Sequence, residues 1–282
     1  MQTDKASTTQ YLELSEGRIA FDDTHTAGPL VICVPGLGDV RAVYRFLVPV
    51  LRAAGYRVVT MDLRGHGESS TGWSDYRDTT IGNDVLALVR HLNAGPAILM
   101  GNSYGGAAVT YAAAMAPDSV AGLVLLDAFV HDLPQTLMQR LAIWAVARLG
   151  AGAWTSYYKS LYVSKQPPDM DTYLAALKAN LRERGRFAAT RAMMYGSHAT
   201  VEAHLDQVKA PTLIVMGSKD PDFPDPAGEA RFTAEKLSGA ASTNIQMIEG
   251  AGHYPYAEMP ERVQAVLLPF LQEIKEKSRH DA

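Results

Sequence analysis

Cysteine is almost absent from this chain. The only one, Cys33, lies inside the apolar run of residues 30–34, so an intrachain disulfide is impossible and we expect a buried, unreactive thiol. A chain without disulfides fits a reducing compartment. The first eight residues are polar and lack the apolar core of a signal peptide. Together these features predict a cytoplasmic protein.

Long apolar runs and an excess of one charge are also missing. No stretch reaches the ~20 apolar residues of a membrane helix, and the longest candidate, residues 141–154, is interrupted by Arg148, Gly150 and Gly152. The 26 Lys and Arg residues against 30 Asp and Glu residues give a formal net charge of -4 and form no dense basic cluster. This balance argues against nucleic acid as a partner. With 47% hydrophobic and 20% charged residues, the composition is that of a globular protein.

Short apolar runs alternate along the chain with longer segments of helical spacing. The strand-like runs are residues 30–34, 57–61, 97–101, 120–126, 212–216 and 244–248. Between them lie patterns such as that of residues 81–92, where apolar side chains recur every three or four positions. Near the N-terminus, residues 11–14 and 18–21 flank Glu16 and Gly17 and predict a hairpin at the edge of the sheet. The alternation indicates an α/β fold with parallel strands joined by helices.

One long gap interrupts this rhythm, because no strand-like run occurs between residues 127 and 211. The gap has helical spacing throughout, and we interpret residues 128–206 as a helical cap inserted into a core made of residues 1–127 and 207–282. The aromatic side chains of this segment are expected to pack beneath the cap: Trp144, Trp154, Tyr157, Tyr158 and Tyr162.

The strongest local signal is Gly101-Asn102-Ser103-Tyr104-Gly105-Gly106, a G-x-S-x-G motif between a buried strand and a helical run. The turn is so tight that side chains at Gly101 and Gly105 would collide with the backbone. Ser103 is therefore expected at the C-terminal edge of the sheet, as a nucleophile. A dinucleotide-binding fingerprint competes poorly, because Gly36 and Gly38 are not followed by the third glycine that it requires.

A serine nucleophile needs a base to take its proton and an acid to orient that base. His253 follows the last strand-like run, where a loop can carry an imidazole over the sheet edge, and Asp220 follows the preceding run. We predict these two residues as base and acid.

Each of the two has rivals. Asp222 lies two residues beyond Asp220, and Asp127 ends the strand-like run of residues 120–126, so either carboxylate is an alternative acid. His66 also follows a strand, but it precedes the serine in the chain and is expected to shape a loop.

The developing oxyanion needs backbone donors, and removal of one such donor costs on the order of 3 kcal/mol. The N–H of Tyr104 is one candidate, and the N–H of Leu37, in the loop of residues 35–39, is the other. The same loop can end in a helix N-cap at Asp39. A metal site is not predicted, because the chain has no H-x-x-x-H or C-x-x-C pair.

Taken together, these motifs make the chain resemble the α/β-hydrolase superfamily from about residue 11 to residue 274. The matching pieces are residues 35–39, 62–69, 101–106, 217–220 and 252–253, and the order Ser, Asp, His is that of the superfamily. The resemblance implies an eight-stranded, mostly parallel sheet with an antiparallel second strand and a cap after the sixth strand. It also implies hydrolysis through an acyl-enzyme, without a cofactor.

Particular residues indicate which branch of the α/β-hydrolase superfamily the chain resembles. Ser103 separates the chain from the dehalogenase and epoxide hydrolase branches, which look similar but carry aspartate at that position. Many relatives have His-Gly where this chain has Pro35-Gly36, a change that keeps the donor at Leu37. Residues 101–106 look like the turn of meta-cleavage-product hydrolases, but the loop of residues 35–39 lacks their further glycines, and Tyr254 stands where those enzymes usually carry tryptophan.

The expected function is therefore that of a carboxylesterase-like serine hydrolase acting on small to medium carboxylic esters or lactones. A carbon-carbon bond hydrolase of the meta-cleavage-product type is the alternative enzyme. A non-catalytic member of the fold that binds a small ligand is the alternative from another class. The sequence leaves the oligomeric state open.

Overall fold

The apolar runs form the centre of one eight-stranded sheet, in the order β1-β2-β4-β3-β5-β6-β7-β8. In chain order the strands are β1 (Gln10–Leu14), β2 (Gly17–Asp23), β3 (Leu30–Val34), β4 (Arg57–Met61), β5 (Ala97–Asn102), β6 (Val120–Leu126), β7 (Thr212–Gly217) and β8 (Thr243–Ile248). Strand β2 is antiparallel to both of its neighbours, β1 and β4. The strand pairs from β4 to β8 are parallel. The predicted α/β-hydrolase architecture, with its antiparallel second strand and its hairpin at the sheet edge, is confirmed.

The computed structural model describes residues 9–280. The polar segment of residues 1–8, on which the absence of a signal peptide was argued, lies outside the described residues. Within residues 9–280 no helix is both long enough and apolar enough to cross a membrane. Cys33 is buried in β3, and burial raises the pKa of its thiol, as expected for an unreactive cysteine.

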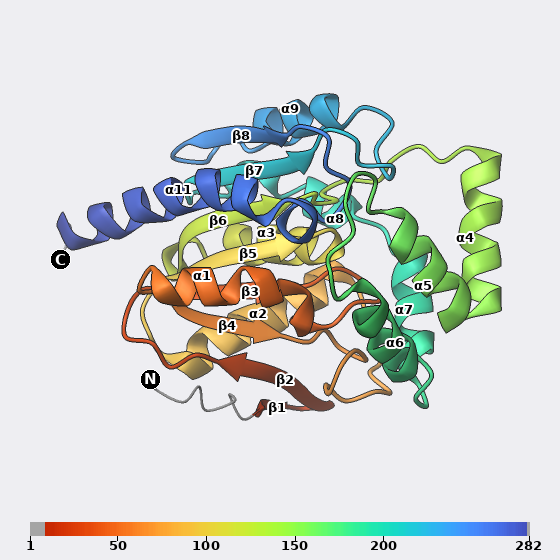
Figure 1. Cartoon of the computed structure of the whole chain (residues 1–282). Coiled ribbons are helices and arrows are strands. Elements are labelled where there is room, and N and C mark those ends of the chain that lie inside the picture. The colour runs from red at the N-terminus through yellow and green to blue at the C-terminus, as the bar shows by residue number, and fades with distance from the viewer. Residues whose placement is uncertain (1–8, 281–282) are drawn as a thin grey trace.

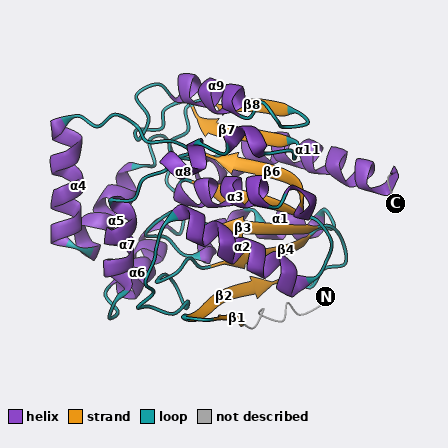
Figure 2. Ribbon diagram, turned by 180° about the vertical axis from the view of Figure 1, so that it is seen from behind, coloured by secondary structure: helices purple, strands orange, loops and turns teal. Residues whose placement is uncertain are grey.

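Helices cover both faces of the sheet (Figures 1 and 2). One face carries α2 (Asp78–Leu92), α3 (Tyr104–Met115) and α9 (Pro226–Lys236), and the other carries α1 (Val48–Ala53) and α11 (Pro260–His280). The short helices η1 (Arg41–Phe46), η2 (Pro117–Ser119), η3 (Leu205–Gln207) and α10 (Pro255–Glu258) join these elements. Because both faces are covered, β3, β5 and β7 are buried along their whole length, which explains their continuous apolar sequences.

Five further helices lie between β6 and β7: α4 (Leu137–Leu149), α5 (Ala151–Ser160), α6 (Met170–Leu181), α7 (Arg186–Met194) and α8 (Ala199–Glu202). The first four gather beside the ends of the strands (Figure 1), whereas α8 packs against α2 and α3. Trp154, Tyr158 and Tyr162 are buried as expected. The expectation is wrong for Trp144, which is 60% exposed.

The parallel register brings the C-terminal ends of the strands to one edge. Gly101 pairs with Val34 on one side and with Leu125 on the other, and Gly217 pairs with Ile248. The loops that follow β3, β5, β6, β7 and β8 therefore leave the sheet together. All the residues that the sequence singled out as functional follow these strand ends.

The turn between β5 and α3 is packed directly against the end of β3. A Cβ atom on Gly105 would lie 2.3 Å from the carbonyl oxygen of Pro35, and one on Gly101 would lie 2.4 Å from that of Gly105. Real Cβ atoms do not approach backbone oxygens so closely, so these two glycines are sterically required, as the sequence predicted.

We expect Gly105→Ala to lower the free energy of unfolding by about 1–3 kcal/mol, because the added methyl group must push the β3 backbone away. Urea denaturation measures this loss. Gly152→Ala is the matched control: its Cβ would meet only Lys178, at 3.7 Å, and stability should stay equal or rise slightly because alanine favours helix. Equal stability of the Gly105→Ala protein and the wild type would contradict the close approach.

Candidate active site

Ser103 occupies the turn between β5 and α3 in a backbone conformation that is rare for a residue with a side chain. Its φ is 53° and its ψ is -123°. The surroundings hold this strained geometry, since its N–H donates to the carbonyl of Leu126 at 3.0 Å and its own carbonyl accepts the N–H of Gly106 at 2.9 Å. The side chain is 7% exposed and borders a cavity.

His253 and Asp220 meet next to this turn. The Nδ1 atom of His253, in the loop after β8, lies 2.6 Å from Oδ2 of Asp220, in the loop after β7. The backbone N–H of His253 donates to the carbonyl of Leu161 at 3.1 Å, which ties the loop to the inserted helices. In the neutral imidazole, the carboxylate holds the proton on Nδ1, which leaves Nε2 as the acceptor.

The imidazole is more basic than an ordinary histidine. Burial by itself lowers the pKa of His253, but the charge and hydrogen bond of Asp220, together with the charge of Asp222, outweigh burial and raise the pKa to about 8. A buried histidine with such a partner is typical of a site that moves protons.

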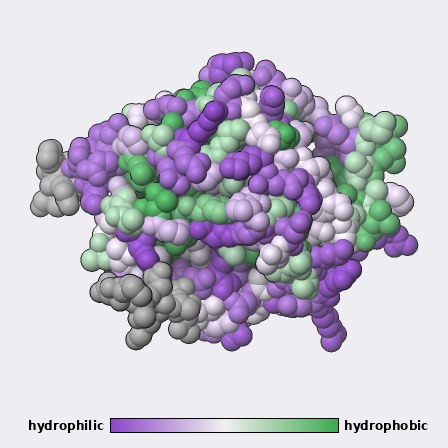
Figure 3. Space-filling model, viewed as in Figure 1, coloured by the Kyte–Doolittle hydropathy of each residue, from purple (hydrophilic) through white to green (hydrophobic). Residues whose placement is uncertain are grey.

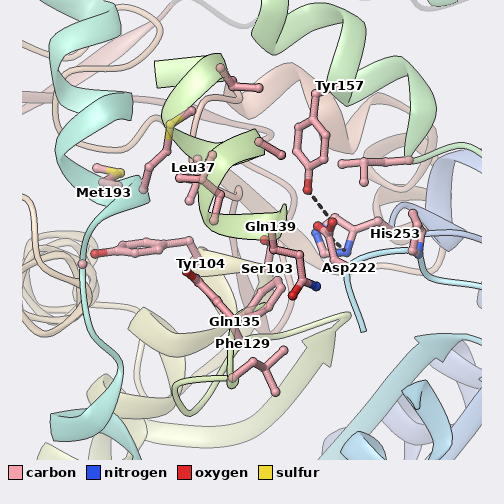
Figure 4. A pocket seen from close by; sticks show the side chains of 18 of the residues that line it. Leu37, Ser103, Tyr104, Phe129, Gln135, Gln139, Tyr157, Met193, Asp222 and His253 are labelled. Atoms are coloured by element: carbon pink, nitrogen blue, oxygen red, sulfur yellow. Dashed lines mark hydrogen bonds and ion pairs between the residues drawn. The ribbon is translucent and has the colours of Figure 1, made fainter. Parts of the chain in front are cut away.

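A cavity of about 710 Å³ opens onto both Ser103 and His253, a volume suited to a small organic ligand. Figure 4 shows Ser103, His253, Asp222 and Tyr157 around it. Leu37 and Tyr104, the two candidate oxyanion donors, also line it. The inserted helices supply much of the remaining wall, through Ala142, Ile143, Val146, Trp154, Tyr157, Met193 and Met194.

Comparison with known proteins identifies the family that has this fold. A family model described as the alpha/beta hydrolase fold matches residues 29–260, a range that contains every strand from β3 to β8 and all the candidate site residues. The chain belongs to the α/β-hydrolase family.

Two relatives and a solved structure illustrate the likeness. The chain is 27% identical over 249 residues to a pimeloyl-[acyl-carrier protein] methyl ester esterase of Neisseria meningitidis, covering 86% of this chain and 76% of that protein. It is 24% identical to AB hydrolase superfamily protein YisY of Bacillus subtilis, with 92% and 98% covered. The structure of an esterase from Thermogutta terrifontis superposes with a TM-score of 0.78 at 24% identity, over 95% of this chain and 100% of that one, which shows the shared fold.

The three candidate acids of this α/β-hydrolase have different partners. Asp220 makes the hydrogen bond to His253, whereas Oδ2 of Asp222 lies 3.9 Å from the same nitrogen. Asp222 instead accepts a hydrogen bond from the hydroxyl of Tyr157. Asp127 accepts the N–H of Gly217 at 2.8 Å. The geometry thus favours Asp220 over both alternatives as the partner of the imidazole.

Asp127 lies beside Asp220 at the bottom of the site. Burial and then the charge of Asp220 raise the pKa of Asp127 well above its usual value, because a second buried negative charge beside Asp220 is unfavourable. Asp127, Asp220 and His253 also have the residue types of a metal site, with one ligand atom of each within 4.8 Å of the others. The bonds to Gly217 and between Asp220 and His253 already explain this cluster.

His66 supports the loop that contains Leu37. Its Nδ1 lies 2.8 Å from the carbonyl of Arg64 and its Nε2 accepts the N–H of Gly38 at 2.9 Å. Burial lowers the pKa of His66 to about 4, which keeps the ring neutral and its Nε2 free to accept. Both ring nitrogens of His66 therefore have backbone partners, in keeping with the expectation that His66 shapes a loop.

Asp39 has hydrogen-bond partners that the sequence analysis did not predict. The N-cap of η1 is Val40, so the expected N-cap at Asp39 is wrong. The Asp39 carboxylate is buried and accepts hydrogen bonds from the hydroxyls of Tyr158, at 2.9 Å, and Tyr173. Burial raises the pKa of Asp39 to about 6. These two tyrosines join α5 and α6 to the loop after β3.

The two buried histidines should titrate far apart. We expect the imidazole of His253 to lose its proton near pH 8, because Asp220 stabilises the charged form, and that of His66 to stay neutral down to about pH 4. NMR of protein with isotope-labelled histidine measures both, with His253→Gln and His66→Gln to assign the signals. Asp220→Asn should lower the pKa of His253, and a value for His253 below that of an exposed histidine in the wild type would contradict the arrangement.

Proposed function

We propose that this α/β-hydrolase is a serine hydrolase of the carboxylesterase kind, cleaving small to medium carboxylic esters or lactones through an acyl-enzyme. One observation carries the proposal: Ser103, on a strained turn, and His253, hydrogen-bonded to Asp220, border the same cavity. The relatives named as esterases support an ester-acting hydrolase.

In the first half of this mechanism, Nε2 of His253 takes the proton of the Ser103 hydroxyl while Oγ attacks the substrate carbonyl carbon. The backbone N–H groups of Leu37 and Tyr104 donate to the oxyanion that forms. When the tetrahedral intermediate collapses, the bond to the alcohol breaks and His253 gives its proton to the leaving oxygen. Ser103 is left acylated.

In the second half, a water molecule attacks the acyl group while His253 takes its proton. The bond to Oγ breaks, the proton returns to Ser103, and the carboxylic acid is released. Throughout both halves Asp220 keeps the Nδ1–H tautomer of His253 and stabilises the imidazolium. The reaction consumes one water and needs no cofactor.

We further propose that residues 128–206 act as a cap over a core of residues 1–127 and 207–282. Helices α4, α5 and α7 supply apolar side chains to the cavity wall, which suits an apolar acyl or alcohol group. The packing of α8 against α2 and α3 anchors the end of this segment to the core. A cytoplasmic location stays a prediction from composition.

Ser103→Ala should lower kcat on a p-nitrophenyl ester by a factor on the order of a million, because the hydroxyl that forms the acyl-enzyme is removed. A fluorophosphonate probe should label the wild type and not this variant. Ser156→Ala, on the exposed side of α5, is the control and should keep full activity and labelling. More than a few per cent of residual activity in folded Ser103→Ala would show that Ser103 is not the nucleophile.

The same assays distinguish the alternative functions. Turnover of ring-fission products without ester cleavage would favour the carbon-carbon hydrolase. Absence of both labelling and turnover in the wild type would favour the ligand-binding alternative.

The acid can be tested by three isosteric changes. Asp220→Asn should lower kcat by a factor on the order of 10⁴, because the imidazole loses the acceptor that holds its tautomer. Asp127→Asn should keep kcat within about tenfold, since a carboxamide oxygen can still accept the N–H of Gly217. The kcat of Asp222→Asn should lie between those of the other two variants, because the change removes a negative charge near His253. If Asp222→Asn or Asp127→Asn were the most damaging variant, the assignment of Asp220 would be wrong.

A further inference from the structure

Helix α4 turns one face toward the cavity and leaves a second, apolar face exposed. Its inner face lines the cavity through Gln139, Arg140, Ala142, Ile143 and Val146. Five large apolar residues outside that lining are exposed: Leu137 (74%), Met138 (78%), Leu141 (55%), Trp144 (60%) and Leu149 (73%). Leu137, Leu141 and Trp144 follow one another at the four- and three-residue spacing that places them on one stripe. Figure 3 shows apolar side chains gathered on the α4 side of the molecule.

The charged side chains of the segment that contains α4 are all positive. Residues 133–168 contain no Asp or Glu, although the whole chain has a net charge of -4. Outside the cavity lining, this segment carries Arg148, Lys159 and Lys165. Lys159 pairs with Asp171 at 2.9 Å. Arg148 is exposed and continues the stripe of Trp144, four residues further along the helix. The outer face is thus apolar and basic.

We propose that the outer face of α4 is an interfacial binding surface that seats the protein on an anionic lipid layer. Leucine and methionine side chains enter the boundary of the acyl chains, tryptophan lies at the level of the headgroups, and Arg148 binds their phosphates. The charge favours lipid over a second copy of this chain: α4 presents the exposed Arg148 but no carboxylate, so a second α4 helix would offer this arginine no acidic partner.

Helix α4 lies between the proposed lipid contact and the cavity of the candidate active site. The same helix presents one face to the lipid and the other to the cavity next to Ser103 and His253. A capping box of Thr136 and Gln139 closes its first turn, and Gly150, at a φ of 83°, ends it. An apolar substrate that leaves the lipid layer therefore reaches the cavity past this helix. The inference goes beyond the proposed hydrolysis, because the contact itself needs no turnover.

Vesicle flotation tests the contact, with vesicles of phosphatidylcholine alone and with about one third phosphatidylglycerol. The wild type should float with the anionic vesicles. Leu141→Gln combined with Leu149→Gln should weaken this binding at least roughly tenfold, because glutamine keeps the helix but removes the apolar area. Arg148→Gln should weaken it about fivefold, on the anionic vesicles only. Met115→Gln, an exposed apolar position at the end of α3, is the control and should bind as the wild type does.

Tryptophan fluorescence gives a second measurement. Trp73 and Trp154 are only 5% and 6% exposed, so a blue shift on adding vesicles reports Trp144 and should vanish in Trp144→Phe. Circular dichroism checks that each variant is folded, and hydrolysis of a water-soluble ester should be unchanged in all of them, because their side chains lie outside the cavity lining. Ser103→Ala should still bind vesicles, which separates this proposal from that of the hydrolase.

Three results would overturn the proposal. In the first, the wild type floats with neither kind of vesicle. In the second, the α4 variants float as well as the wild type. In the third, analytical ultracentrifugation finds a wild-type dimer that the Leu141→Gln and Leu149→Gln changes disperse while vesicle binding is absent, which would assign the outer face to a second copy.

Discussion

The parallel register of the central strands is the constraint on which the site depends. Because Gly101 pairs with both Val34 and Leu125, the loops after β3, β5 and β6 leave the sheet side by side. The close approach of Gly105 to the carbonyl of Pro35 then sets the distance between the turn of Ser103 and the loop of Leu37. Any backbone shift at this contact would move the candidate nucleophile relative to the candidate oxyanion donors.

Four carboxyl groups surround one imidazole, and each has its own partner. Asp220 is paired with His253, Asp222 with the hydroxyl of Tyr157, and Asp39 with two tyrosines, while Asp127 accepts the N–H of Gly217, and burial beside Asp220 raises its pKa well above the usual value. Unpaired negative charges so close together would repel one another in a medium of low dielectric constant. Hydrogen bonds donated to Asp222, Asp39 and Asp127 reduce this repulsion, while the carboxylate of Asp220 raises the pKa of His253.

The inserted helices connect the site with the surroundings of the protein. Tyr158 and Tyr173 tie α5 and α6 to the loop after β3 through the buried Asp39, and Trp154 donates to the carbonyl of Gly38 at 2.8 Å. In contrast, α4 stands at the outside of this group, with one face on the cavity and an exposed apolar face opposite. The same insertion thus has a part that is firmly bonded to the core and a part that is free to meet a partner.

The sequence alone was sufficient for the strands, for the turn around Ser103 and for the steric need for glycine at positions 101 and 105, because local spacing and backbone sterics act between near neighbours. It did not decide between Asp220, Asp222 and Asp127 as the acid. It also predicted a helix N-cap at Asp39 and a buried Trp144, and both predictions are wrong. Tertiary structure decided these points. The partners concerned, such as Asp39 and Tyr158, are far apart along the chain, and their contacts and burial depend on how whole helices pack, which no local pattern encodes.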